Sequence, residues 1–193
     1  MPRTKQFDEK EVLNKAMELF WEKGFHATSM QDLVTQLGIN RASLYDTFGD
    51  KEALFEAAFQ LYRQTNGGVI QGLFETEPSV KEGFQKLFQM AIDESVQDGN
   101  RKGCFVVNTI TELIPGDEKI QSLLLENTIN YEKLFTAFVQ KGIQNGEINA
   151  IKNPNEIGLM LYALFNGIRV LAKVDPNPEK LKSIMKSGLS VLD

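Results

Sequence analysis

Cysteine and histidine are almost missing from this sequence: its 193 residues include one of each, Cys104 and His26. A single cysteine excludes an internal disulfide and is typical of a reducing compartment. A zinc site built from Cys and His ligands is excluded as well. A carboxylate site for a hard cation is compatible with the composition, but no loop has the ligand spacing of such a site. The sequence therefore predicts no metal and no other cofactor.

Long apolar runs are also missing. No uncharged apolar run approaches the roughly 20 residues that a membrane-spanning helix needs, and the first residues have no apolar core of the signal-peptide kind. Strand-like alternation is scarce, whereas apolar residues recur at helical spacing throughout. Hydrophobic residues make up 42% of the chain and charged residues 24%, an ordinary globular balance. We expect a cytoplasmic, all-α protein without a membrane partner.

The sequence contains none of the common catalytic motifs. There is no G-x-S-x-G, and His26 is the only histidine that could pair with a nucleophile. Gly67 and Gly72 are spaced like the ends of a phosphate-binding loop, but Leu73 and Phe74 follow where Lys and Ser/Thr are needed. The prediction is that the chain is not an enzyme.

An excess of positive charge is missing too. The net charge is −5, whereas proteins that bind nucleic acids usually carry a basic surface. A DNA-binding role therefore has to depend on a few local cations, namely Arg3, Lys5, Arg41 and Lys51. The charge balance keeps a second interpretation open, a helical ligand-carrier or interaction module with a degenerate DNA-binding motif.

Residues 28–52 contain a pattern that is typical of helix, tight turn and helix. Gly38 ends the first helix, and Asn40 is suited to cap the second. A helix pair of this size commonly places its second helix in the DNA major groove. Arg41 and Ser43 then lie on the exposed side of that helix, where polar groups reach bases and phosphates.

Helical spacing continues to the end of the chain and predicts about nine helices. Capping residues, glycines and prolines separate them. We expect a three-helix DNA-binding domain over residues 1–50. A long helix beginning at Lys51 then leads into a helical ligand-binding and dimerisation domain over residues 51–193.

The order LFWEKGFHATS, LGIN, SLYDTFGDKEAL within residues 18–55 resembles the tetracycline-repressor-like (TetR/AcrR) family of bacterial transcriptional regulators. The segments KGCFVVNTITEL and NGEI…LYALFNGIRVLAK resemble the ligand-binding half of one branch of that family. The resemblance covers nearly the whole chain. It implies an all-α fold, a homodimer, a double-stranded DNA operator, and repression that a small molecule relieves.

The resemblance also implies which positions contact DNA. Asp46 stands where the family often carries an aromatic or basic residue; a carboxylate there repels phosphate but could accept a hydrogen bond from a cytosine amino group. Two readings stay open for Arg41, a DNA contact or a solvated charge, and for Tyr45, core packing or a phosphate contact. The predicted DNA-binding residues are Thr28, Ser29, Met30, Arg41, Ala42, Ser43, Tyr45, Asp46, Thr47 and Lys51.

Aromatic residues interleaved with polar groups in the second half of the chain predict an effector cavity, although each aromatic residue alone is compatible with a core position. Such a lining favours a small, largely apolar effector. Cys104 could be an inert buried residue or a thiol sensor, and Arg169 could pair with a ligand carboxylate or form a structural ion pair. The predicted lining is Phe84, Phe88, Cys104, Phe105, Asn108, Thr109, Tyr131, Phe135, Tyr162, Phe165, Asn166 and Arg169.

The last two predicted helices carry more apolar residues than one contact face requires. A two-fold pairing of these helices would bury the surplus in a four-helix interface, and a two-fold dimer would read a roughly palindromic operator. The predicted interface residues are Ile157, Met160, Leu161, Leu164, Ile168, Leu171, Leu181, Ile184, Met185 and Leu189.

Overall fold

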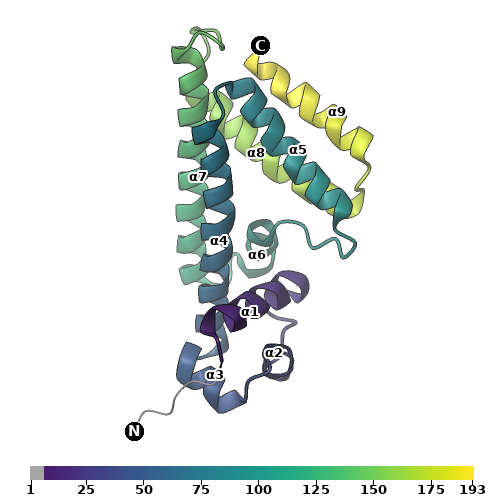
Figure 1. Ribbon diagram of the computed structural model, residues 1–193. Coiled ribbons are helices and arrows are strands. Elements are labelled where there is room, and N and C mark those ends of the chain that lie inside the picture. Colours follow the sequence, from purple (N-terminus) through teal and green to yellow (C-terminus); the bar gives the residue numbers. More distant parts are fainter. Residues whose placement is uncertain (1–6) are drawn as a thin grey trace.

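The computed structural model describes residues 7–193 and contains only helices over that range (Figure 1). The all-α prediction with about nine helices is confirmed for this part of the chain. The helices are Glu9–Lys23 (α1), Met30–Leu37 (α2), Arg41–Phe48 (α3), Lys51–Thr76 (α4), Val80–Gln97 (α5), Phe105–Leu113 (α6), Glu118–Gln144 (α7), Pro154–Val174 (α8) and Pro178–Leu189 (α9), followed by a 3-10 turn at Ser190–Leu192 (η1).

Capping side chains mark the beginning of the helices, as the sequence indicates. Asp8 caps α1, and Ser29 caps α2 in a reciprocal capping box with Asp32. Asn40 and Asp50 cap α3 and α4 with hydrogen bonds of 2.8 Å to backbone N–H groups. Each cap satisfies donors that the first helical turn would otherwise leave unbonded.

The two long helices α4 and α7 lie side by side and connect the two ends of the molecule (Figure 1). The short helices α2 and α3 sit at one end with α1 packed across α4. Helices α5, α8 and α9 gather at the other end, and α6 lies between the two groups. Helix α4 is continuous through Gly67 and Gly68, so it joins both ends without a loop.

The buried side chains form two hydrophobic cores. The upper core joins α5, α7, α8 and α9 with the end of α4. The lower core joins α1, α2, α3 and the first part of α4, and it also contains Phe105 and Leu113 of α6 and Ile120 and Leu124 of α7. The lower end is therefore completed by segments far along the chain. The division between residues 1–50 and 51–193 stays a prediction.

Helix α8 is the one described helix whose length and apolar composition would allow it to cross a membrane. Ile157, Leu161, Phe165 and Ile168 on one of its faces are buried in the upper core, and the helix packs along α7. This is the packing of a core helix in a bundle.

Candidate nucleic-acid interface and ligand site

The pair α2–α3 has the geometry of a helix-turn-helix. Gly38 ends α2 in the left-handed conformation with φ of +68°, which a glycine adopts without steric cost. Ile39 and Leu44 are buried and anchor the turn and α3 on the lower core. Since these residues fix one side of α3, its other side is presented to solvent at the end of the molecule (Figure 1).

The predicted contact residues on α3 occupy that free side. Arg41, Ala42, Tyr45 and Asp46 are exposed. The guanidinium of Arg41 lies over the Tyr45 ring at 5.6 Å from its centroid. The half-buried Ser43 and Thr47 lie at the edges of this face. Tyr45 is 41% exposed, so its ring is available to a ligand rather than packed in the core.

The start of α2 gives a mixed result for the predicted phosphate contacts. Thr28 is fully buried, and its hydroxyl donates to the carbonyl of Gly24 at 2.6 Å. The Thr28 side chain therefore cannot reach a phosphate, and its role is to shape the loop. Ser29 is exposed and Met30 is half-buried at the first helical position, where backbone N–H groups favour an anion.

Lys51 begins α4 beside the same surface. Its ammonium lies 4.4 Å from the centre of the Phe25 ring, a cation–π contact that holds the charge near the loop before α2. Lys23 is paired with Asp32 at 2.9 Å and is thus partly neutralised. Arg3 and Lys5 lie outside the described residues. Arg41 and Lys51 are consequently the main positive charges that the described structure offers at this end.

An interior cavity lies between α4, α6, α7 and α8. Its volume is about 20 Å³, which is room for about one water molecule. Six of the predicted effector residues are brought together here, namely Cys104, Tyr131, Tyr162, Phe165, Asn166 and Arg169. The sequence interpretation missed Tyr62, Asn66, Val106 and Asn127, which complete the lining.

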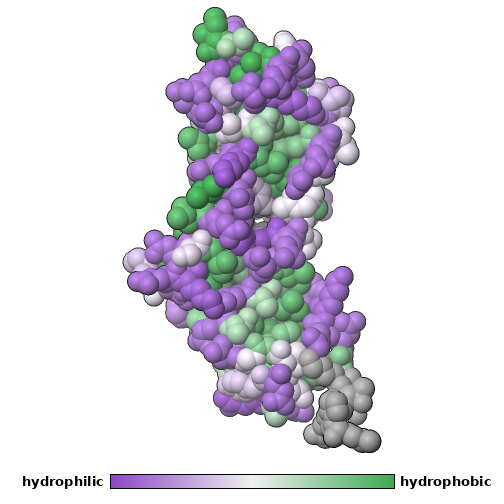
Figure 2. Space-filling model, turned by 90° about the vertical axis from the view of Figure 1, so that its left-hand side faces the viewer, coloured by the Kyte–Doolittle hydropathy of each residue, from purple (hydrophilic) through white to green (hydrophobic). Residues whose placement is uncertain are grey.

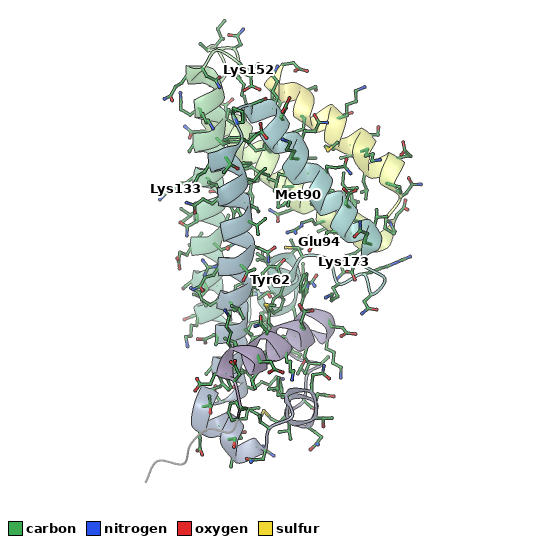
Figure 3. All side chains as sticks on the ribbon, viewed as in Figure 1. Tyr62, Met90, Glu94, Lys133, Lys152 and Lys173 are labelled. Carbon is green, nitrogen blue, oxygen red and sulfur yellow. The ribbon has the colours of Figure 1, made fainter. Side chains whose placement is uncertain are left out.

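Cys104 is held by two polar neighbours inside this cavity. The guanidinium of Arg169 lies 3.4 Å from the Cys104 sulfur, and the hydroxyl of Tyr62 lies 3.9 Å from it. Arg169 also pairs with Glu94 at 3.0 Å, so the structural ion pair considered from the sequence is present. Figure 3 shows Tyr62 on α4 next to α6, with Glu94 close to the start of that helix.

Two stacked tyrosines form another wall of the cavity. The rings of Tyr131 and Tyr162 are 5.6 Å apart and nearly parallel. Burial raises the pKa of Tyr131 to about 12, and burial also raises the pKa of Tyr162. Burial raises the pKa of Tyr62 well above its usual value, with a further contribution from Cys104. All three phenols therefore stay protonated and able to donate near neutral pH.

The other six predicted effector residues do not line the cavity. Phe84, Phe88 and Phe135 are fully buried in the upper core, and Phe105 belongs to the lower core. The residue Thr109 is buried and donates to the carbonyl of Phe105 in its own helix. The remaining one, Asn108, is bonded to the carbonyl of Lys102 and to Lys173. The four phenylalanine rings among them pack against other core side chains instead of facing the cavity. The effector contacts themselves stay a prediction.

The predicted interface residues divide into three groups by their burial. Ile157, Leu161, Ile168, Leu181 and Met185 are buried inside the protomer, so they cannot supply area to a partner. Leu164, Ile184 and Leu189 are half-buried against the upper core. Met160 and Leu171 are exposed, and the structure adds Leu159, Val170 and Val174 to the same exposed side of α8.

Family models match both the N-terminal and the C-terminal part of the chain. Residues 12–58 match the family model of bacterial regulatory proteins of the tetR family. Residues 82–187 match the tetracyclin repressor-like C-terminal domain. These two matches agree with the resemblance read from the sequence.

Individual relatives extend over the whole chain. An uncharacterized HTH-type transcriptional regulator of Bacillus subtilis, YezE, is 32% identical over 100% of both chains. The HTH-type transcriptional repressor ComR of Escherichia coli is 30% identical over 97% of this chain and 90% of its own. A cysteine mutant of the TetR family regulator CifR, solved with a 26 bp operator DNA, is 26% identical with a TM-score of 0.88 and covers 99% of this chain and 100% of its own. The chain belongs to the tetR family of bacterial regulatory proteins.

Proposed function

We propose that the protein is a ligand-responsive transcriptional regulator, most simply a repressor, that binds a palindromic operator as a homodimer in the cytoplasm. The observation that carries this proposal is the free face of α3, with Arg41 and Tyr45 exposed on a helix whose opposite side is anchored by Leu44. Operator complexes of the relative CifR support the same use of this fold. We also propose that the protein acts as a regulator and not as an enzyme.

Dimerisation is proposed through the exposed side of α8. Leu159, Met160, Val170 and Leu171 are each 40–46% exposed, and they recur at the spacing of one helix face. A Cβ at Gly167 on this side would meet nothing within 4 Å in the protomer, so a partner helix can approach closely there. Burying these apolar side chains favours association because it removes them from water.

The link between ligand and DNA is proposed to run through α6. Cys104 and Val106 at the start of this helix line the interior cavity, whereas Leu113 at its end packs in the lower core beside the DNA-binding helices. A ligand that prefers one position of α6 would thereby change the spacing of the two α3 helices in the dimer. It can do so only by its difference in affinity for the two states.

The experiment is to incubate the protein with sheared genomic DNA and to sequence the fragments that it retains. We expect a short set of fragments with a shared inverted repeat whose half-sites lie about one helical turn apart or somewhat more. Affinity for such a duplex should fall steeply with salt. Retention of fragments without a common sequence, or no retention, would favour the alternative of a ligand-carrier or interaction module with a degenerate motif.

A further inference from the structure

A surface groove with a volume of about 530 Å³ runs between α4 and α7, on the outer side of the interior cavity. Five of its residues come from α4 and five from α7, at spacings that keep each set on one helix face. Its lining consists of Gln60, Arg63, Gln64, Gly67, Gln71, Asn127, Asn130, Tyr131, Lys133 and Leu134. Figure 2, which views the left side of the molecule in Figure 1, shows mainly hydrophilic side chains across the middle of that face.

The residues that line the groove carry positive charge only, and the nearest carboxylate is that of Glu126 at its edge, 3.7 Å from Arg63. Five side-chain amides supply both donors and acceptors, Arg63 and Lys133 supply positive charge, and the lining contains no carboxylate. Such a surface is poorly suited to a cation or to a purely apolar molecule. It is suited to an anion whose uncharged part carries hydrogen-bonding groups.

Arg63 is built into the groove rather than freely solvated. Its side chain is only 9% exposed. Its Nε donates to Asn127 at 3.0 Å and one terminal nitrogen donates to Gln60 at 3.0 Å. The exposed Glu126 lies 3.7 Å from the other terminal nitrogen. A guanidinium has five N–H donors, so these contacts hold it in place and leave donors for a ligand.

Lys133 supplies a second charge from the facing helix. Within residues 7–193 it has no hydrogen bond or ion pair, and Figure 3 shows its side chain extending away from the bundle. Its ammonium is therefore free to turn toward an anion in the groove. Gly67 adds no side chain to the floor of the groove, and a Cβ there would make an ordinary contact with the Tyr131 hydroxyl at 3.7 Å.

The groove and the interior cavity share two residues, Asn127 and Tyr131. Asn127 is buried and accepts the hydrogen bond from Arg63. An anion that binds the remaining N–H groups of Arg63 would shift the guanidinium and thereby alter this contact. The position of Asn127, and with it the wall of the cavity next to α6, would then depend on occupancy of the groove.

We propose that the α4–α7 groove binds a small organic carboxylate with additional hydroxyl or amide groups, whose carboxylate is held by Arg63 and Lys133, and that this molecule is the effector. The identification of this molecule as the effector depends on the proposed function. Binding of the molecule in the groove does not depend on it. The assignment differs from the largely apolar effector expected from the sequence, since four of the aromatic residues on which that expectation depended, Phe84, Phe88, Phe105 and Phe135, are packed in the cores.

The test uses two matched pairs of probes that differ in charge: 4-hydroxybenzoate with 4-hydroxybenzamide, and gluconate with sorbitol. Binding to the wild-type protein is measured by ligand-observed NMR and calorimetry at low salt. We expect saturable binding of at least one acid up to millimolar concentration, with its neutral counterpart bound at least about 10-fold more weakly, because charge-assisted hydrogen bonds are lost.

Arg63→Gln should weaken binding of that acid by about 10-fold or more, and Lys133→Gln by about 2- to 5-fold. Lys133→Gln is the decisive variant if Arg63→Gln is unstable, since Lys133 supports no other contact among the described residues. Lys10→Gln, an exposed α1 lysine outside the groove, is the matched control and should leave acid binding unchanged.

The proposal is overturned if neither acid binds saturably, if the neutral counterparts bind equally well, or if Lys133→Gln and Arg63→Gln both keep wild-type affinity. Retention of operator DNA is measured on the same preparations without any acid. If the wild-type protein bound no DNA, that result would contradict only the proposal that the protein is a regulator. The proposal that the groove binds an acid would still be decided by the Arg63 and Lys133 variants.

Discussion

The carboxylate of Glu112 accepts the backbone N–H of His26 at 2.7 Å, across 86 positions of sequence. Its second oxygen accepts the N–H of Phe25 at 3.0 Å. Glu112 lies near the end of α6, and the two amides lie in the loop that leads into α2. One side chain therefore connects α6, which lines the interior cavity, to the loop that sets the position of the DNA-binding helix pair.

Replacing Glu112 should loosen that loop. Glu112→Ala removes both acceptors, and we expect operator affinity to fall by about 10-fold because hydrogen bonds to a charged group are lost. Glu112→Gln keeps one acceptor oxygen and should have an intermediate effect. Fluorescence anisotropy with an operator duplex gives the affinity, and amide exchange of Phe25 and His26 reports the loop. Glu118→Gln, an exposed carboxylate on α7, is the control; an equal effect there would contradict the role of Glu112.

Gly24 faces the same carboxylate and should not tolerate a side chain. Its backbone has φ of +84° and ψ of 171°, a region used almost only by glycine, so Gly24→Ala should cost about 1–3 kcal/mol from backbone strain alone. A Cβ would also lie 2.7 Å from an oxygen of Glu112. In urea unfolding, the Gly24→Ala, Glu112→Ala double variant should be less destabilised than the sum of the single variants. Simple additivity would show that the two residues act independently.

Lys51 should act on DNA through charge rather than through sequence. Lys51→Ala is expected to weaken binding to all duplexes alike and to reduce the salt slope by about one unit, as for the loss of one phosphate contact. Ser43→Ala or Thr47→Ala should change base preference instead, because these residues lie on α3. Binding titrations at several salt concentrations separate the two effects. An altered preference with an unchanged slope in Lys51→Ala would reverse these assignments.

A charge placed on the exposed side of α8 should separate the dimer. Met160→Glu would bring two carboxylates into an apolar interface, where unpaired charge is strongly unfavourable. Sedimentation should show a monomer at micromolar concentration, and operator affinity should drop together with dimerisation. Met90→Glu is the matched control, because Met90 on α5 is similarly exposed, 47% against 40%. If both variants remained dimeric, the interface would lie elsewhere.

Alkaline pH should destabilise the protein partly through Tyr131. Its pKa is raised from 10.0 to about 12 by burial, so the folded state holds this proton more tightly than the unfolded state. The associated stability is complete below about pH 10 and is lost as the pH rises toward about 12. The temperature of thermal unfolding should decrease less steeply with rising pH for Tyr131→Phe than for the wild-type protein. Identical slopes would mean that Tyr131 titrates alike in both states.

Local signals explain which features could be predicted from the sequence. The caps at Ser29 and Asn40 and the break at Gly38 act within a few residues, so the helix-turn-helix could be predicted from the sequence. The lining of the interior cavity could be predicted only in part, because a ring that lines a cavity and a ring that packs in a core recur at the same helical spacing. Phe84 and Phe135 illustrate this, with ring centres 5.4 Å apart inside the upper core.

Long-range contacts explain the remaining differences. The bond between Glu112 and His26 has no signal in either segment alone. The buried Asn127 stands at a position that helical spacing would give to an apolar residue, and this was the available sign of a polar wall. Helix α8 is apolar on more than one side, and periodicity does not reveal which side faces the protomer. Gly158 belongs to the inner side, since a Cβ there would collide with Thr136 of α7.

The contribution of α6 and α7 to the lower core limits how the protein can be divided. Phe105 makes edge contacts with Phe55, Phe59 and Tyr62 of α4, at ring-centre distances of 5.4–5.8 Å. A fragment ending within α4 would expose these rings to water and should aggregate or unfold. A chimera that exchanges DNA-binding ends with a relative should therefore carry α6 along with α1–α4. The unit that could be exchanged between relatives therefore consists of two segments that are separated in the sequence.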